Sequence, residues 1–136
     1  MSRILCIDYG GKRTGLAVTD PLQLIATALT TIDTKELFNY LKTYVAAENV
    51  SLILIGYPLD LNDKATHATP LVEAAIKQLK TTFPSIPIQK VDERYTSKMA
   101  SMAMVHMGMK KKDRQQKSNI DKIAATIMLQ DYLAYR

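Results

Sequence analysis

Apolar and polar positions recur along this chain with two periods, and each period predicts a different kind of element. Short apolar runs bounded by turn residues predict strands at 3–8, 14–19, 27–32, 51–55 and 86–92. Apolar residues that recur every three or four positions predict helices at about 34–48, 65–82, 97–107 and from 119 onward. Polar residues suited to helix N-caps precede three of them: Asp33 or Thr34, Thr96 or Ser97, and Asn119.

The order of these elements indicates the fold class. Three strands come first, joined by turns at Gly10-Gly11 and near Pro21, and strands then alternate with helices. A meander requires antiparallel pairing, whereas strand–helix–strand units require parallel pairing with right-handed crossovers. We therefore expect an α/β fold with a mixed five-stranded sheet flanked by helices. The apolar runs 4–7 and 52–55 are typical of its central strands.

Length and composition narrow the class of protein. The 136 residues suit a single domain over 1–136, and 47% apolar with 23% charged residues is ordinary for a soluble globular chain. No apolar run approaches the ~18 residues of a membrane span, and Asp8 interrupts the apolar stretch near the N-terminus, unlike in a signal peptide. Cys6 is the single cysteine, so no internal disulfide is expected and a cytoplasmic location is the default.

The positive charge of the chain is concentrated in one segment. The net charge is +5, which favours a polyanionic partner such as nucleic acid. The stretch 108–118 lacks apolar periodicity and is expected to be an exposed, mobile loop. With the Gly10-Gly11 turn, this loop supplies the candidates for holding a nucleic-acid backbone: Lys12, Arg13, Lys110, Lys111, Lys112, Arg114 and Lys117.

Three acidic positions end or open elements that the fold is expected to bring together. Asp8 ends the first strand, Asp92 or Glu93 ends the fifth, and Asp121 opens the last helix. Ligands of α/β sheets bind at the carboxyl edge of the central strands. Converging carboxylates repel unless a divalent cation lies between them, and oxygen ligands favour Mg²⁺ or Mn²⁺. Such a site suits phosphodiester hydrolysis, because the metal activates water and stabilises the leaving oxygen.

Each acidic position also has a purely structural interpretation. Asp8 can accept hydrogen bonds from the Gly10-Gly11 turn that follows it. Asp92, Glu93 and Arg94 can form a surface ion-pair cluster, and Asp121 is favoured by the helix dipole in any first turn. Ala124 and Ala125 favour the functional interpretation of Asp121, because small residues one turn later let the helix approach the sheet.

Taken together, four blocks of this sequence resemble the YqgF family, also called RuvX-like, of pre-16S ribosomal RNA nucleases within the RNase H-like superfold. The blocks span essentially the whole chain, in family order and at family spacing. They are the residues DYGGKRTGLAVTD at 8–20, IGYPL at 55–59, VDERYTS at 91–97 and IDKIAATIMLQDYL at 120–133. One departure is Asn62-Asp63, where the family usually has a glycine after the Gly-x-Pro-Leu turn.

The resemblance implies an RNase H-like sheet and a carboxylate site for Mg²⁺ or Mn²⁺. It points to Asp8, Glu93 and Asp121 as catalytic and metal-ligating residues. It also implies a bacterial cytoplasmic protein linked to maturation of the 5′ end of pre-16S ribosomal RNA. Family members are similar in fold to Holliday junction resolvases.

The leading hypothesis is therefore a metal-dependent nuclease, with RNA as the favoured substrate and branched DNA as the alternative. The backbone contacts would be those listed above together with Tyr57 and Arg94. Two other classes stay open: a phosphotransfer ATPase, since Asp-x-Gly before a basic hairpin resembles the phosphate loop of actin-like kinases, and a nucleic-acid-binding module without catalysis. The sequence leaves open whether the protein is a monomer or a homodimer, and whether it binds one metal ion or two.

Overall fold

The structure is a computed structural model that describes residues 1–58, 68–92 and 117–136, without the side chains of 117–122. Five strands form its centre: β1 (Arg3–Asp8), β2 (Arg13–Thr19), β3 (Ala26–Asp33), β4 (Val50–Tyr57) and β5 (Ile88–Asp92). Within these described ranges, three α-helices cover the strands: α1 (Leu37–Ala47), α2 (Thr69–Thr82) and α5 (Lys117–Tyr135). A short 3₁₀ helix at Thr34–Glu36 leads into α1.

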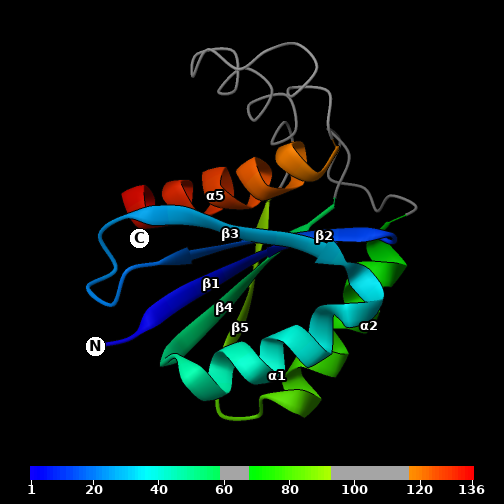
Figure 1. Ribbon diagram of the computed structural model, residues 1–136, viewed down its shortest axis with the longest axis horizontal. Helices are drawn as coiled ribbons and strands as arrows, with labels where there is room; N and C mark the ends of the chain where they lie inside the picture. Colours follow the sequence, from blue (N-terminus) through cyan, green and yellow to red (C-terminus); the bar gives the residue numbers. More distant parts are fainter. Residues whose placement is uncertain (59–67, 93–116) are drawn as a thin grey trace.

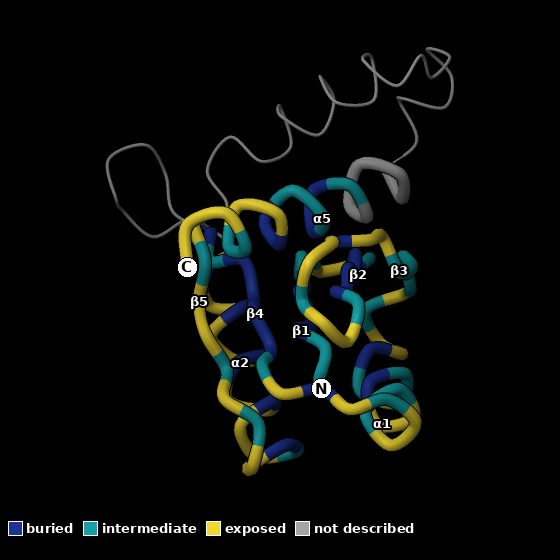
Figure 2. Tube along the Cα trace, turned by 90° about the vertical axis from the view of Figure 1, so that its left-hand side faces the viewer, coloured by how far each residue is buried: buried dark blue, intermediate teal, exposed yellow. Residues whose placement is uncertain are grey.

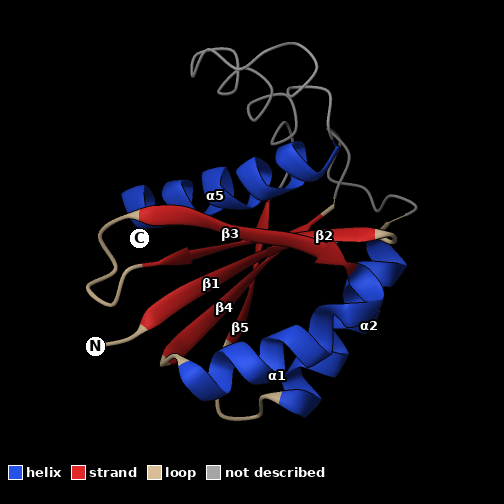
Figure 3. Cartoon of the chain, in the orientation of Figure 1, coloured by secondary structure: helices blue, strands red, loops and turns tan. Residues whose placement is uncertain are grey.

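The five strands form one mixed sheet, as the sequence predicts, and their order in it is β3-β2-β1-β4-β5 (Figure 3). The meander β1-β2-β3 pairs antiparallel, whereas β1, β4 and β5 run parallel to one another. Leu5, Cys6 and Ile7 on β1 are fully buried, as expected for a central strand covered on both faces. The carboxyl ends of β1, β4 and β5 therefore meet at one edge, which we call the carboxyl edge.

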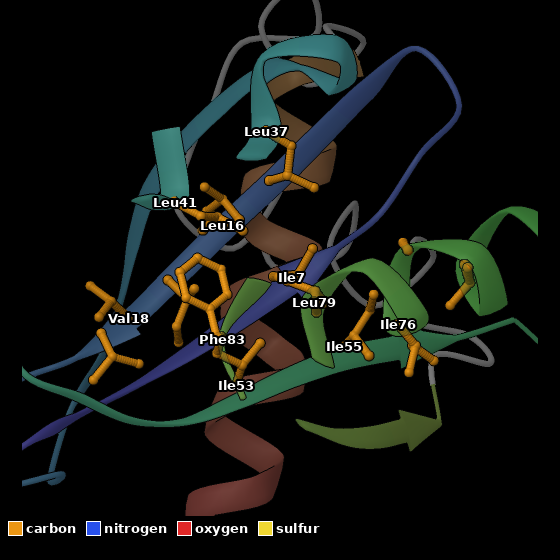
Figure 4. Close-up of a cluster of buried hydrophobic side chains, with 14 residues drawn as sticks. Ile7, Leu16, Val18, Leu37, Leu41, Ile53, Ile55, Ile76, Leu79 and Phe83 are labelled. Atoms are coloured by element: carbon orange, nitrogen blue, oxygen red, sulfur yellow. The ribbon is translucent and has the colours of Figure 1, made fainter. Parts of the chain in front are cut away.

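The fold has three layers, because helices cover both faces of the sheet (Figure 1). Helices α1 and α2 lie on one face, over a cluster of large aliphatic side chains that includes Ile7, Ile55 and Leu79 (Figure 4). Helix α5 lies on the other face, over a smaller cluster that includes Cys6, Ala17 and Ala125. The sheet layer between the helices is buried along β1 and β4 (Figure 2). No helix within the described ranges is long and apolar enough to cross a lipid bilayer.

Two local predictions are wrong, and a third is not tested. Helix α5 begins at Lys117 rather than after an Asn119 cap, so the last two residues of the predicted loop 108–118 are helical. No proline or glycine lies between 117 and 119, so nothing there prevents an earlier start. Neither Asp33 nor Thr34 makes a side-chain cap for α1; the N-cap of that helix is Glu36, without a cap bond. The predicted helix at 97–107 lies outside the described residues.

The direction of α5 decides which of its ends is near the carboxyl edge. Its last turn is next to Arg136, whose guanidinium donates to the Gln23 side-chain oxygen at 2.8 Å. The Gln23 side-chain amide in turn donates to the Ser2 carbonyl at 3.1 Å, just before β1 begins. The C-terminal end of α5 is therefore beside the start of β1, and its N-terminal end points toward the carboxyl edge (Figure 1).

Candidate active site

Asp8 is the last residue of the central strand and lies on the face that α5 covers. Side chains alternate along a strand, and Ile4 and Cys6 of β1 belong to the cluster under α5. Asp8 shares their side of the strand and is half-buried. A carboxylate is thus presented at the carboxyl edge, next to a dry apolar layer that raises the cost of leaving its charge uncompensated.

The turn after Asp8 is held by threonines. Thr34 Oγ1 donates to the Gly10 carbonyl at 2.6 Å and lies 2.9 Å from Thr14 Oγ1. The Thr34 backbone amide also donates to the Lys12 carbonyl at 3.0 Å. Gly10 is required here, since a Cβ at that position would lie 2.3 Å from the Arg13 carbonyl oxygen. The threonine bonds therefore fix the geometry of the turn that follows Asp8.

Strand alternation shows on which face of the sheet Asp92, the last residue of β5, lies. Val91 packs in the cluster under α5, whereas Ile88 packs in the cluster under α1 and α2. Because side chains alternate along a strand, Asp92 lies on the opposite face from Val91, which is the face that α2 covers. Asp92 is exposed. Asp92 is therefore on the opposite face from Asp8, and Glu93 lies outside the described residues.

Helix α5 brings position 121 toward the same edge as Asp8. Ala124 and Ala125 are 1% and 0% exposed and face the sheet, together with Met128 and Leu129. Position 121 precedes them by one helical turn and lies on the same stripe of the helix. The small side chains let the helix backbone approach β1 and β2 closely, so position 121 is at the end of α5 that points toward the carboxyl edge.

Among the residues whose side chains are described, no group of three acidic, histidine or cysteine residues is close enough to hold a metal ion. These residues include Asp8 and Asp92 but not Glu93 or Asp121. The predicted acidic set therefore stays a prediction, with Asp8 as its one member whose side chain is placed.

A second cluster lies at the same edge, on the α2 face, and the sequence did not indicate it. Tyr57 ends β4, and its hydroxyl donates to Glu73 Oε1 on α2 at 2.5 Å. Lys90 on β5 donates to the same oxygen at 3.1 Å, and its Nζ lies 4.4 Å from the centroid of the Tyr57 ring. The bond to Glu73 raises the pKa of the Tyr57 hydroxyl, and the bonds from Tyr57 and Lys90 lower the pKa of Glu73.

The other predicted nucleic-acid contacts are only partly described. Lys12 is exposed on the turn after β1, and Arg13 is half-buried at the start of β2. Lys117 opens α5 instead of lying in a loop, and nothing of its side chain is described. The remaining members lie outside the described residues: Arg94, Lys110, Lys111, Lys112 and Arg114.

A carboxylate at the opposite end of the sheet has a plainly structural role. Asp20 follows β2, and its side chain accepts the backbone amides of Leu24 and Ile25, each at 2.8 Å, and of Leu22 at 3.2 Å. The Ile25 amide is the largest of several contributions that lower the pKa of Asp20. Asp20 thus holds the loop after β2 by accepting hydrogen bonds from backbone amides.

Comparison with known proteins decides the family. The sequence profile of the RuvX family, described as "Holliday junction resolvase", matches residues 2–135. The chain belongs to the RuvX family. This match confirms the YqgF resemblance that the four sequence blocks indicated.

Similar sequences cover the chain almost completely. A protein of Bacteroides thetaiotaomicron named "Putative pre-16S rRNA nuclease" is 52% identical over 133 residues, covering 98% of this chain and 96% of the relative. A relative of the same name from Flavobacterium psychrophilum is 49% identical, with 98% and 97% covered. RuvX is thus a nuclease family, with members of this length.

Solved structures support the fold. RuvC of T. thermophilus, solved in complex with a Holliday junction substrate, matches with a TM-score of 0.60 over 98% of this chain and 95% of that chain, at 13% identity. YeaZ from Pseudomonas aeruginosa matches with a TM-score of 0.50 over 79% of this chain and 50% of that chain. RuvC has an RNase H-like fold, so the predicted fold class is confirmed.

Proposed function

We propose that this RuvX member is a metal-dependent nuclease that hydrolyses phosphodiester bonds at the carboxyl edge of its sheet. The placement of Asp8 carries the proposal. This carboxylate ends the central strand at the carboxyl edge, on the face toward which α5 brings position 121. The acidic set proposed for the reaction is Asp8, Glu93 and Asp121.

The chemistry of these donors suits Mg²⁺ or Mn²⁺. All three side chains offer carboxylate oxygens, which hard divalent cations prefer, and neither histidine of the chain is needed as a ligand. The position of Asp92 on the opposite face from Asp8 favours Glu93 as the member from the end of β5. When bound, the ion supplies Lewis-acid stabilisation of the phosphodiester oxygens and a water molecule of lowered pKa.

The chain itself supplies position and charge. Asp8 holds its carboxylate at a fixed place, because β1 is paired on both sides and the following turn is pinned by Thr34. Lys12 is exposed on that turn and can neutralise a phosphate next to the cleaved bond. The basic residues of 110–117, together with Arg13 and Arg94, are proposed to hold flanking nucleotides.

Precursor 16S ribosomal RNA is the substrate we favour, since relatives that are about half identical to this chain over nearly its whole length are named for it. Acting on this RNA places the protein in the bacterial cytoplasm. Branched DNA is the second candidate, favoured by the description of the family and the fold of RuvC. A junction resolvase cuts two strands and requires a dimer with two sites, whereas a monomer suffices for trimming RNA.

The deciding experiment compares two labelled substrates with the full chain and Mg²⁺: a pre-16S RNA fragment with its 5′ extension, and a four-way DNA junction. We expect cleavage of the RNA, its loss on chelation, and its loss in Asp8→Asn. Cleavage of the junction alone, together with dimer formation in sedimentation, would establish the second candidate. Tight binding to either substrate without any cleavage would instead establish a binding module.

A further inference from the structure

The cluster of Tyr57, Glu73 and Lys90 is the strongest feature that the proposed reaction does not use. The sequence predicted that Tyr57 belongs to the nucleic-acid-binding residues, in a loop that a nucleic-acid backbone approaches. In the structure its hydroxyl proton is donated to Glu73 and one face of its ring is covered by the Lys90 ammonium. The hydroxyl and one ring face of Tyr57 are therefore engaged within the protein. Its neighbours Glu73 and Lys90 determine what this part of the edge can bind.

Lys90 keeps the capacity to bind an anion. An ammonium has three N–H donors; Glu73 accepts from one of them, and the face of the Tyr57 ring attracts the positive charge electrostatically. The Lys90 side chain is 50% exposed, so its head also reaches solvent. Two neighbours hold the lysine in one direction, which reduces the conformational entropy that it would lose on contacting a phosphate.

The location relative to Asp8 suits a nucleic-acid strand that crosses the edge. In the sheet β4 separates β5 from β1, which puts the two strands about 10 Å apart. Lys90 lies two residues before the end of β5. Lys90 lies on the α2 face and Asp8 on the α5 face, so a strand that contacts both must cross the carboxyl edge, with several nucleotides between the two contacts.

Glu73 limits the strength of this contact. Its carboxylate lies 3.1 Å from Lys90 Nζ and competes with any phosphate for that charge. Asp92 lies on the same face as Lys90, two residues further along β5, and adds a second negative charge. On the outer surface of α2, Lys77 and Lys80 follow Glu73 at helical spacing and partly offset both carboxylates.

We propose that Lys90 is a phosphate-contacting residue of the substrate-binding surface, that Tyr57 positions it, and that Glu73 weakens the contact by competing for the ammonium. This inference rests on the proposed nuclease function, because it requires a nucleic-acid backbone at the carboxyl edge. It assigns to Tyr57 a positioning role in place of direct contact with the substrate.

The test measures equilibrium binding apart from cleavage. The probe is a fluorescein-labelled single-stranded RNA of about 20 nucleotides, longer than one binding site, titrated with the full chain in EDTA at several salt concentrations. The variants are Lys90→Ala, Glu73→Gln and Tyr57→Phe. Lys42→Ala on α1 and Glu36→Gln in the 3₁₀ helix serve as matched controls, since both residues are exposed and lie on elements that do not contribute to this cluster.

We expect Lys90→Ala to weaken binding and to flatten the slope of log K against log salt by roughly 0.7, while Lys42→Ala leaves the slope unchanged. Glu73→Gln should tighten binding by about 1.5- to 5-fold at low salt, the range of one exposed ion pair, and Glu36→Gln should not. Tyr57→Phe should weaken binding less than Lys90→Ala, because the ring remains.

Two results would overturn the inference. Equal salt slopes for Lys90→Ala and Lys42→Ala would show that the cluster only ties α2 to the sheet, and weaker binding by Glu73→Gln would show that Glu73 supports the contact. A wild-type protein that cleaves RNA with either result leaves the proposed function standing. A wild-type protein that neither binds nor cleaves nucleic acid removes both proposals.

Discussion

The two faces of the sheet are covered by side chains of different size. Large aliphatic residues from β1, β4, α1 and α2 fill one face, with Leu41, Ile53 and Leu79 fully buried. The face under α5 holds four small buried residues, Cys6, Ala17, Ala26 and Ala125, beside the larger Ile4, Leu54, Met128 and Leu129. Large side chains bury the most apolar surface and contribute most to stability, about 1.5–3 kcal/mol each. Small side chains contribute less but let a helix backbone come close to the strands.

This difference between the two faces accounts for the location of the candidate site. Asp8 emerges on the face with small residues, and the same small residues bring the N-terminal half of α5 toward the carboxyl edge. The other face presents Tyr57, Glu73 and Lys90 at that edge, beside α2, which packs on large aliphatic residues. We therefore expect substitutions on the two faces to separate activity from stability.

The largest effect is expected from Asp8→Asn. Removing one preorganised charged group should lower the cleavage rate by at least about 10²- to 10³-fold. Asp92→Asn is the matched control on the opposite face and should change the rate little. Thermal unfolding of the metal-free protein should show Asp8→Asn equally or more stable, because it relieves repulsion among carboxylates. A similar loss of activity in Asp92→Asn would contradict the assignment of faces.

Leu79→Ala tests the face with large residues. Leu79 is fully buried in the cluster under α1 and α2, so truncation should lower the free energy of unfolding by about 2–5 kcal/mol through lost burial and a cavity. The cleavage rate measured well below the unfolding transition should stay near that of the wild type. Urea denaturation and a cleavage assay on the same samples check both statements.

Ala125→Leu tests the face with small residues. Ala125 is fully buried against β1 and β2, so three extra carbons should cost about 1–3 kcal/mol by overpacking. Activity should fall by more than the loss of stability explains, because α5 must move away from the edge that holds Asp8. Ala74→Leu, on the exposed surface of α2, is the control. Unchanged activity in a destabilised Ala125→Leu protein would separate α5 from the site.

The smallest effect is expected from Asp20, which anchors the loop beneath the C-terminal end of α5. Its pKa is lowered in the folded state, so its contribution to stability is present above the unfolded pKa of aspartate and is lost as pH falls through the folded value. Asp20→Asn should therefore lower the melting temperature slightly at neutral pH and flatten its decline below about pH 4. Asp33→Asn, an exposed aspartate at the end of β3, is the control for charge alone.

Period and order in the sequence were enough to predict the sheet. The alternation of apolar runs with amphipathic segments predicted five strands, and the position of the meander before the strand–helix units predicted mixed pairing. Such patterns are local, since each strand carries its own period and each connection limits its own pairing. The four blocks of motifs likewise predicted the RuvX family, because they record residue identities that do not depend on contacts.

Other features were decided by contacts between residues far apart in the chain. Thr34 looked like a helix cap and instead holds the Gly10 turn, 24 residues away. Asp8 and Asp20 both follow strands in the sequence, yet Asp20 holds a loop through three backbone amides and Asp8 lies at the carboxyl edge.

The cluster of Tyr57, Glu73 and Lys90 shows the same limit of sequence reasoning. Its members come from β4, α2 and β5, and each one alone is an ordinary surface residue. The sequence alone was enough to predict the strands along the chain, their mixed pairing and the family. Which face a carboxylate occupies, and which charge it meets there, depended on register and helix packing, because those set the distances over which charges and hydrogen bonds act.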